Sequence, residues 1–161
     1  MKRVGIDIGR VIISGGNEGV DFFSKNYLKV PEVPFASRSV AKIVQEYGAH
    51  NVFLISKCSE AIQHKTLEWL EVQNFFNTMH IYRHQVLFCR NRDEKAQIVK
   101  EHAIDTFIDD RFAVLKHMLF LKELYLFNPS ADEQAEALNC PAASHVHTIT
   151  HWDDLLSLLI K

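Results

Sequence analysis

The amino-acid sequence predicts an α/β fold, a three-layer doubly wound domain with a central parallel sheet. Segments typical of strands and of helices alternate along nearly the whole chain. Strand-like segments such as Val52-Phe53-Leu54-Ile55 are continuously apolar, which is typical of strands that are buried on both faces between layers of helices. Alternating elements of this kind favour parallel strands joined by right-handed crossovers.

The expected elements follow one another in a regular order. Strands are predicted over Arg3–Ile8, Asn51–Ile55, part of Ile81–Phe88, Asp105–Ile108, Glu123–Phe127 and Val146–Ile149. Helices are predicted over Ser37–Tyr47, Ser59–Leu70, Asp93–His102, Arg111–Leu121, Asp132–Leu138 and His151–Leu159.

Local signals support the beginnings and ends of several of these elements. The first strand is a short apolar run that ends in an acid, Asp7. Ser37 and Ser59 stand where the N-cap of a helix is expected. Ser130 and Thr150 are each followed three residues later by an acidic residue, a spacing that fits the capping box.

Length and composition restrict the class of protein. A chain of 161 residues with 47% hydrophobic and 24% charged residues is expected to form one domain, 1–161, without a separate cap domain. The formal charge of −2 argues against nucleic acid or an anionic membrane as the main partner. No apolar run approaches the roughly 20 residues of a membrane span. The short first strand leaves no room for a signal-peptide core, and three widely spaced cysteines fit free thiols in a reducing cytoplasm.

The region from about 12 to 36 interrupts the alternation of strands and helices. It contains a glycine cluster over 15–19 and two prolines, Pro31 and Pro34. Glycines directly after a strand that carries an acid indicate a loop or small hairpin flap beside a site. An ordinary long surface loop is an equally good interpretation.

Four segments carry polar side chains that are suited to catalysis or metal binding. Asp7, Ser56 and Asp109-Asp110 each lie at the end of a predicted strand, and Lys95 lies in a predicted helix. Ligands of doubly wound folds bind beyond the carboxyl ends of the strands. Clustered carboxylates repel one another, and a hard divalent cation with oxygen ligands relieves that repulsion. Mg²⁺ is the expected cation.

Taken in order, these segments resemble the four motifs of the haloacid dehalogenase (HAD) superfamily, most of whose members are Mg²⁺-dependent phosphohydrolases. The resemblance implies that Asp7 is the nucleophile and also a metal ligand. It implies that Gly9 offers its main-chain carbonyl to the metal, and that Asp109-Asp110 completes the metal site. Ser56 would bind a phosphate oxygen, and Lys95 would neutralise the nucleophile and the phosphate. Beside these motifs, Lys57 and Arg111 would steer an anionic substrate.

Gly9 departs from the family pattern, because phosphatases of this type carry a second aspartate there. That aspartate is the general acid and base, and its loss costs typically about 10²–10⁴-fold in rate. Arg10 does not replace it, since a guanidinium stays protonated at working pH.

Two function hypotheses therefore stay open. The first is a phosphohydrolase or phosphotransferase acting on a phosphorylated small molecule or macromolecule. The second is a degenerate relative that binds Mg²⁺ and a phosphorylated ligand without turnover. A phosphorelay receiver domain fits less well, because it expects its acid pair near the N-terminus rather than at Asp109-Asp110.

Other conspicuous residues have ordinary explanations. His145, His147 and His151 resemble a metal cluster, but solvated strand and cap histidines are favoured because no cysteine or carboxylate lies at ligand spacing. Cys58 follows the second motif, where a buried structural cysteine is favoured over a reactive thiol. An apolar stripe is favoured as core packing, although exposure there would indicate self-association. It consists of Trp69, Leu70, Phe75 and Phe76.

Overall fold

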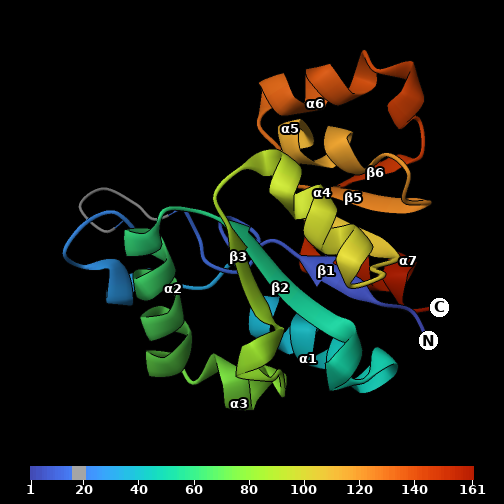
Figure 1. Ribbon diagram of the computed structural model, residues 1–161. Helices are drawn as coiled ribbons and strands as arrows, with labels where there is room; N and C mark the ends of the chain where they lie inside the picture. Colours follow the sequence, from blue (N-terminus) through green and yellow to red (C-terminus); the bar gives the residue numbers. More distant parts are fainter. Residues whose placement is uncertain (16–20) are drawn as a thin grey trace.

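A computed structural model describes residues 1–15 and 21–161. Its centre is an all-parallel sheet with the strand order β3-β2-β1-β4-β5-β6, and helices cover both faces (Figure 1). The predicted three-layer α/β architecture is confirmed. The strands of this sheet are β1 (Val4–Ile6), β2 (Val52–Lys57), β3 (Val86–Cys89), β4 (Thr106–Asp109), β5 (Glu123–Phe127) and β6 (Val146–Ile149).

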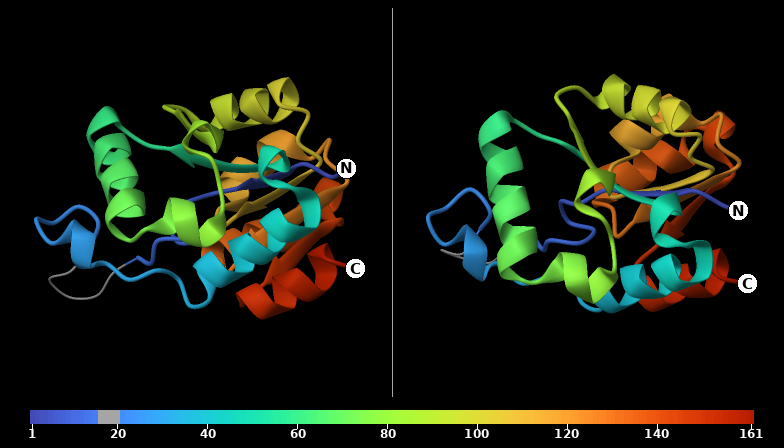
Figure 2. Two further views of the ribbon diagram at one scale, coloured as in Figure 1. Left: turned by 90° about the horizontal axis from the view of Figure 1, so that it is seen from below. Right: turned by 60° about the horizontal axis from the view of Figure 1, so that its bottom comes forward.

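The helices lie in two layers, one on each face of the sheet. In chain order they are α1 (Ala36–Tyr47), α2 (Glu60–Val72), α3 (Phe75–Met79), α4 (Arg92–Glu101), α5 (Phe112–Leu115), α6 (Ala131–Leu138) and α7 (Trp152–Leu159). Figure 2 shows α1 and α7 side by side on one face, with α4 on the other. None of the helices in the described part of the chain combines the length and the apolar character that crossing a membrane requires.

Each face of the sheet has its own apolar core. One core joins β1, α1 and α7 through side chains such as Ile6, Ile43 and Leu155. The other joins β4 to α4 through Phe107 and Val99. The central strands β1, β2 and β4 are therefore buried on both faces, as continuous apolar sequences predict. The edge strand β6 is partly exposed.

Two of the four predicted helix caps are confirmed. The hydroxyl of Ser59 accepts a hydrogen bond from the Ile62 amide at 3.3 Å, and Ser130 does the same for the Glu133 amide at 3.3 Å. The other two predictions are wrong, as the first turns of α1 and α7 show.

Helix α1 begins one residue earlier than predicted, at Ala36, and Phe35 occupies the N-cap position without a side-chain bond. Ser37 instead binds the carboxylate of Glu32 through its amide and its hydroxyl. His151, not Thr150, is the N-cap residue of α7, and it makes no side-chain cap bond.

The helix predicted over Arg111–Leu121 is wrong in length. Helix α5 ends at Leu115 and continues as a single 3₁₀ turn, Lys116–Met118. All four residues of α5 are buried, so packing rather than amphipathic periodicity determines this segment. The short helix α3 is an addition to the predicted elements, and Asn74 in the left-handed conformation (φ 59°) separates it from α2.

The described residues of the region from about 12 to 36 are anchored to the core, and their regular structure before α1 is a 3₁₀ turn, Tyr27–Lys29. Ile12, Ile13 and Val30 are fully or almost fully buried. Ile13 forms isolated β-bridges to Gly9 and to Glu32. The predicted glycine cluster lies partly outside the described residues, which resume at 21.

Candidate functional site

The sheet order brings two acid-bearing strand ends together. Strands β1 and β4 are neighbours although about 100 residues separate them in the chain. Ile6 pairs with Ile108, and the amide of Asp7 donates to the Ile108 carbonyl at 2.9 Å. Asp7 and Asp109 therefore leave the sheet side by side, at the position where strand order reverses and doubly wound folds bind their ligands.

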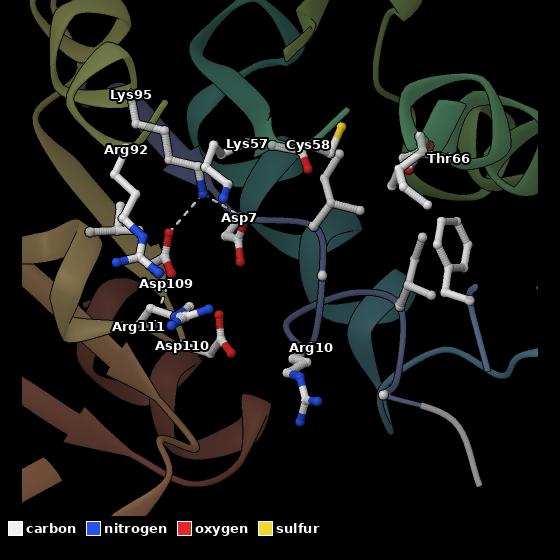
Figure 3. A pocket seen from close by; sticks show the side chains of 18 of the residues that line it. Asp7, Arg10, Lys57, Cys58, Thr66, Arg92, Lys95, Asp109, Asp110 and Arg111 are labelled. Atoms are coloured by element: carbon white, nitrogen blue, oxygen red, sulfur yellow. Dashed lines mark hydrogen bonds and ion pairs between the residues drawn. The ribbon is translucent and has the colours of Figure 1, made fainter. Parts of the chain in front are cut away.

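Lys95 of α4 connects these two carboxylates. Its ammonium group lies 2.7 Å from Asp7 Oδ1 and 2.8 Å from Asp109 Oδ2, as Figure 3 shows. The three residues are 93–99% buried. The second oxygen of Asp109 accepts the amide of Arg111 at 2.9 Å, so the carboxylate of Asp109 is held at both ends.

Asp110 adds a third carboxylate to the cluster. Asp7, Asp109 and Asp110 each offer an oxygen, and these oxygens lie within 4.8 Å of one another. An all-oxygen donor set suits a hard cation such as Mg²⁺, which binds one or two carboxylates together with water and substrate phosphate. The donor chemistry of the cluster fits this ion.

Burial and electrostatic repulsion raise the pKa values of two of these acids, Asp7 and Asp110. Burial raises the pKa of Asp7 to about 6; the charge of Asp109 adds to the rise and Lys95 opposes it. Burial raises the pKa of Asp110 to about 8, with further contributions from Asp7 and Asp109. Burial by itself lowers the pKa of Lys95, but the charges of Asp109 and Asp7 outweigh it and raise that pKa above its usual value. Lys95 therefore stays protonated at neutral pH.

The cluster lies in a cleft of about 1070 Å³ that also contains Ser56 and Gly9. Ser56 is buried near the end of β2. A Cβ added at Gly9 would meet nothing within 4 Å, and the φ of Gly9 is outside the left-handed region. Neither crowding nor backbone conformation requires glycine at this position. The left-handed residue in this turn is Arg10, with φ 63°.

Five basic side chains lie around the cluster on the cleft wall. Sequence reasoning found Lys57 and Arg111, and it missed the others. The missed residues are Arg10, Arg90 and Arg92. Arg111 contacts Glu133 at 3.5 Å, and Arg90 donates to Gln63. Arg92 had a detectable signal, because it precedes Lys95 by three residues and so shares its helix face.

The histidines and the apolar stripe take no part in this site. Within residues 1–15 and 21–161, Asp7, Asp109 and Asp110 are the single group able to offer three metal ligands. His147 stacks on Tyr125. Trp69, Leu70 and Phe75 are buried, and Phe76 packs partly buried against them. The stripe is therefore core packing.

Cys58 lines the cleft as a half-buried free thiol. Burial raises its pKa, although Ser56 and Arg90 oppose the rise. The thiol therefore stays protonated at neutral pH and is a poor nucleophile there.

The structure thus brings every residue of the four sequence segments to one cleft. Asp7, Lys95 and Asp109-Asp110 touch one another at its base, while Ser56 and Gly9 lie on its wall. Neither the known protein-family models nor the curated protein sequences give a match to this chain.

Proposed function

We propose that this protein is a Mg²⁺-dependent phosphohydrolase or phosphotransferase of the HAD type, in which Asp7 is the nucleophile. One observation carries the proposal: three carboxylates converge within 4.8 Å around a buried lysine at the carboxyl edge of a parallel sheet. Such an edge is where ligands of this fold class bind. The site takes a phosphorylated small molecule or macromolecule as its partner.

The residues support a two-step displacement. A carboxylate oxygen of Asp7 attacks phosphorus, the bond from phosphorus to the leaving oxygen breaks, and an aspartyl phosphate forms. Water then attacks phosphorus, gives up a proton to solvent, and releases phosphate from Asp7. Throughout, Lys95 balances the charges of Asp7 and Asp109, to which it is bonded at 2.7 and 2.8 Å. Ser56 binds a phosphate oxygen from the wall of the cleft.

The proposed cation site consists of Asp7, Asp109, Asp110 and the main-chain carbonyl of Gly9. Mg²⁺ at this place would neutralise the carboxylates and withdraw charge from the phosphoryl group. The basic residues on the cleft wall also interact with negative charge, at a greater distance from the cluster. Lys57, Arg92 and Arg111 attract an anionic substrate from solution. The three free cysteines agree with a reducing compartment such as the cytoplasm.

Gly9 limits which substrates react well. No side chain at residue 9 protonates the leaving oxygen, so that oxygen must leave as an anion or take its proton from water. Acyl and aryl phosphates have stable leaving anions and should react much faster than alkyl phosphates.

A second candidate function is a non-catalytic module that binds Mg²⁺ and a phosphorylated ligand. Gly9 favours it, because the acid is missing where neither sterics nor backbone geometry demands glycine. The intact cluster of Asp7, Lys95 and Asp109 serves binding equally well.

Turnover measurements distinguish the two functions. Purified protein would be assayed with acetyl phosphate, 4-nitrophenyl phosphate and glycerol 3-phosphate, with Mg²⁺ and with EDTA. We expect hydrolysis of the first two that requires Mg²⁺ and disappears in the Asp7→Asn variant. If all three compounds stay intact while phosphate and Mg²⁺ bind, the enzyme proposal is wrong and the binding module remains.

A further inference from the structure

The cleft around Asp7 has two unlike walls. On one side lie Asp109, Asp110, Arg92 and Arg111, all charged. The other side is formed by the face of α2 and by residues 13 and 22–23. Its members are Ile13, Phe22, Phe23, Ile62 and Thr66. Figure 3 shows Thr66 across Asp7 from Asp109 and Arg92. We call this second side the apolar wall.

The apolar wall is a built structure rather than a loose loop. Ile62 and Thr66 are four residues apart in α2 and so share one helix face. The segment that carries Phe22 and Phe23 is tied to the same helix by several bonds. Lys65 donates to the Phe23 carbonyl at 3.4 Å, and Tyr27 bonds to Glu68. Further along, Trp69 Nε1 donates to the Val30 carbonyl at 2.9 Å.

The two phenylalanines present aromatic surface to the cleft in different ways. Phe22 is partly buried against the core and contacts Tyr27 edge-on, with ring centroids 6.0 Å apart. Phe23 lines the cleft while its side chain is 78% exposed. A bound ring would cover this surface, and aromatic pairs gain attraction beyond the area that they bury.

We propose that the cleft binds phosphate monoesters whose organic part is an aromatic ring, with the phosphate at Asp7 and the ring on the apolar wall. This inference rests on the proposed phosphate chemistry at Asp7. Two independent features support it. The wall supplies apolar and aromatic surface in the same cleft as the charged cluster. Gly9 favours a leaving oxygen that is stable as an anion, and a phenol with a pKa of about 10 satisfies this far better than an alkyl alcohol.

The proposal is tested by binding, so that it does not depend on turnover. Isothermal titration in the presence of Mg²⁺ would compare methylphosphonate with 1-naphthylmethylphosphonate, which share the anion and differ in the ring. We expect the naphthyl compound to bind at least tenfold more tightly. Phe23→Ser should reduce that ratio to below threefold. Phe23 is exposed, so the variant should keep its fold.

Phe120→Ser is the matched control, because Phe120 is 50% exposed and does not line the cleft. The ratio should be unchanged in it. Equal binding of the two phosphonates to the wild type overturns the aromatic wall while leaving the phosphate site intact. Failure of both phosphonates to bind overturns the phosphate site and the wall together.

Two further measurements complete the test: the KM values of two substrates and the binding of a peptide. Phe23→Ser should raise KM for 1-naphthyl phosphate at least fivefold more than it raises KM for acetyl phosphate. A short phosphotyrosyl peptide, run beside 1-naphthyl phosphate, identifies the source of the ring. Tighter binding of the peptide assigns a protein substrate, and tighter binding of the naphthyl ester assigns a small molecule. Weak binding of both, at the level of acetyl phosphate, overturns the proposal.

Discussion

At the scale of single residues, Lys95 compensates two buried acids. It is 2% exposed and bonds to Asp7 and Asp109, which are 7% and 1% exposed. Buried charges are costly unless each has a partner. With Asp110 beside them, the carboxylates still outnumber the one ammonium group in contact. Burial raises the pKa values of Asp7 and Asp110, and this imbalance adds to the rise. The excess of negative charge also attracts a cation.

Removing the ammonium group should strongly destabilise the fold. Lys95→Met keeps most of the side-chain volume but leaves two buried carboxylates without their partner, and we expect a loss of about 3–5 kcal/mol in the free energy of unfolding. Urea denaturation without divalent cations measures it. Lys116→Met is the control, because the pair of Lys116 with Glu136 is exposed, at 3.7 Å, and is worth about 0–1 kcal/mol. Equal effects of the two substitutions would contradict this account of Lys95.

Gly9 permits a gain-of-function prediction. If Asp7 is a competent nucleophile and the acid alone is missing, Gly9→Asp should raise the hydrolysis of glycerol 3-phosphate at least about tenfold, part of the roughly 10²–10⁴-fold credited to such a group. The open space around a Cβ at Gly9 and the ordinary φ of this residue mean that the backbone accepts a side chain here. The initial rate of phosphate release, with Mg²⁺, measures the gain.

Two controls accompany this experiment. Gly9→Ala adds a Cβ without an acid and should leave the rate unchanged. Asp7→Asn in the Gly9→Asp background should abolish the gain, since an amide is a poor nucleophile. A folded Gly9→Asp protein that binds Mg²⁺ and phosphate but remains inactive would favour the binding module.

At the scale of elements, β1 connects the site to both cores. It is only three residues long, all buried, and it pairs with β2 on one side and β4 on the other. Val4 and Ile6 pack into one core. On the opposite face Gly5 leaves room for the ring of Phe107, whose Cδ2 would be 2.6 Å from a Cβ at Gly5. A strand held this closely positions Asp7 with little freedom.

Gly5→Ala should therefore destabilise the protein where Gly9→Ala does not. The added methyl group collides with Phe107, and overpacking of this kind costs typically about 1–3 kcal/mol. Thermal unfolding of the two variants provides the comparison. The double variant Gly5→Ala/Phe107→Leu should lose less stability than the sum of the losses in the two single variants, because the smaller leucine makes room for the methyl group. If the effects of Gly5→Ala and Phe107→Leu are simply additive, the collision is not the cause.

At the scale of the whole molecule, the acidic cluster links stability to pH. The folded-state pKa of Asp110 is about 8 against 3.8 in the unfolded chain, and that of Asp7 is about 6. Between these values the folded protein retains protons that the unfolded chain has lost. By linkage, the stability from these groups is largest near pH 4 and is lost as the pH rises toward 8.

In EDTA, the free energy of unfolding should fall as the pH rises from 5.5 to 8. The slope from one group does not exceed about 1.4 kcal/mol per pH unit. In Asp110→Asn the free energy of unfolding should depend less on pH over the same range. This difference separates the cluster from other titrating groups. Urea titrations at several pH values measure both proteins.

Mg²⁺ should remove this pH dependence, because it binds the deprotonated carboxylates and stabilises the folded state. Asp109→Asn and Asp110→Asn should weaken the rise in melting temperature with Mg²⁺. If high Mg²⁺ leaves the melting temperature of the wild type and of the variants unchanged, the cation site is contradicted.

The sequence by itself determined the fold class, the order of the elements and the strand ends that carry acids. Apolar runs and helical periodicity are local properties, as are the caps at Ser59 and Ser130, so each can be detected within a few residues of chain. The same reasoning failed at Ser37 and in the helix predicted over Arg111–Leu121. At Ser37 a competing local contact changes the outcome, because the carboxylate of Glu32, five residues earlier, binds Ser37. In α5 burial overrides the local signal, and the helix ends after four buried residues.

Only the tertiary structure decided which of these residues meet. Pairing of β1 with β4 joins segments about 100 residues apart, and nothing local specifies that neighbour. The double contact of Lys95, the place of Arg92 on the cleft wall and the apolar wall on α2 depend likewise on how helices pack on the sheet. The distances of 2.7 to 4.8 Å between the side chains of the cluster result from long-range packing. The residue types and their spacing, in contrast, can be read directly from the sequence.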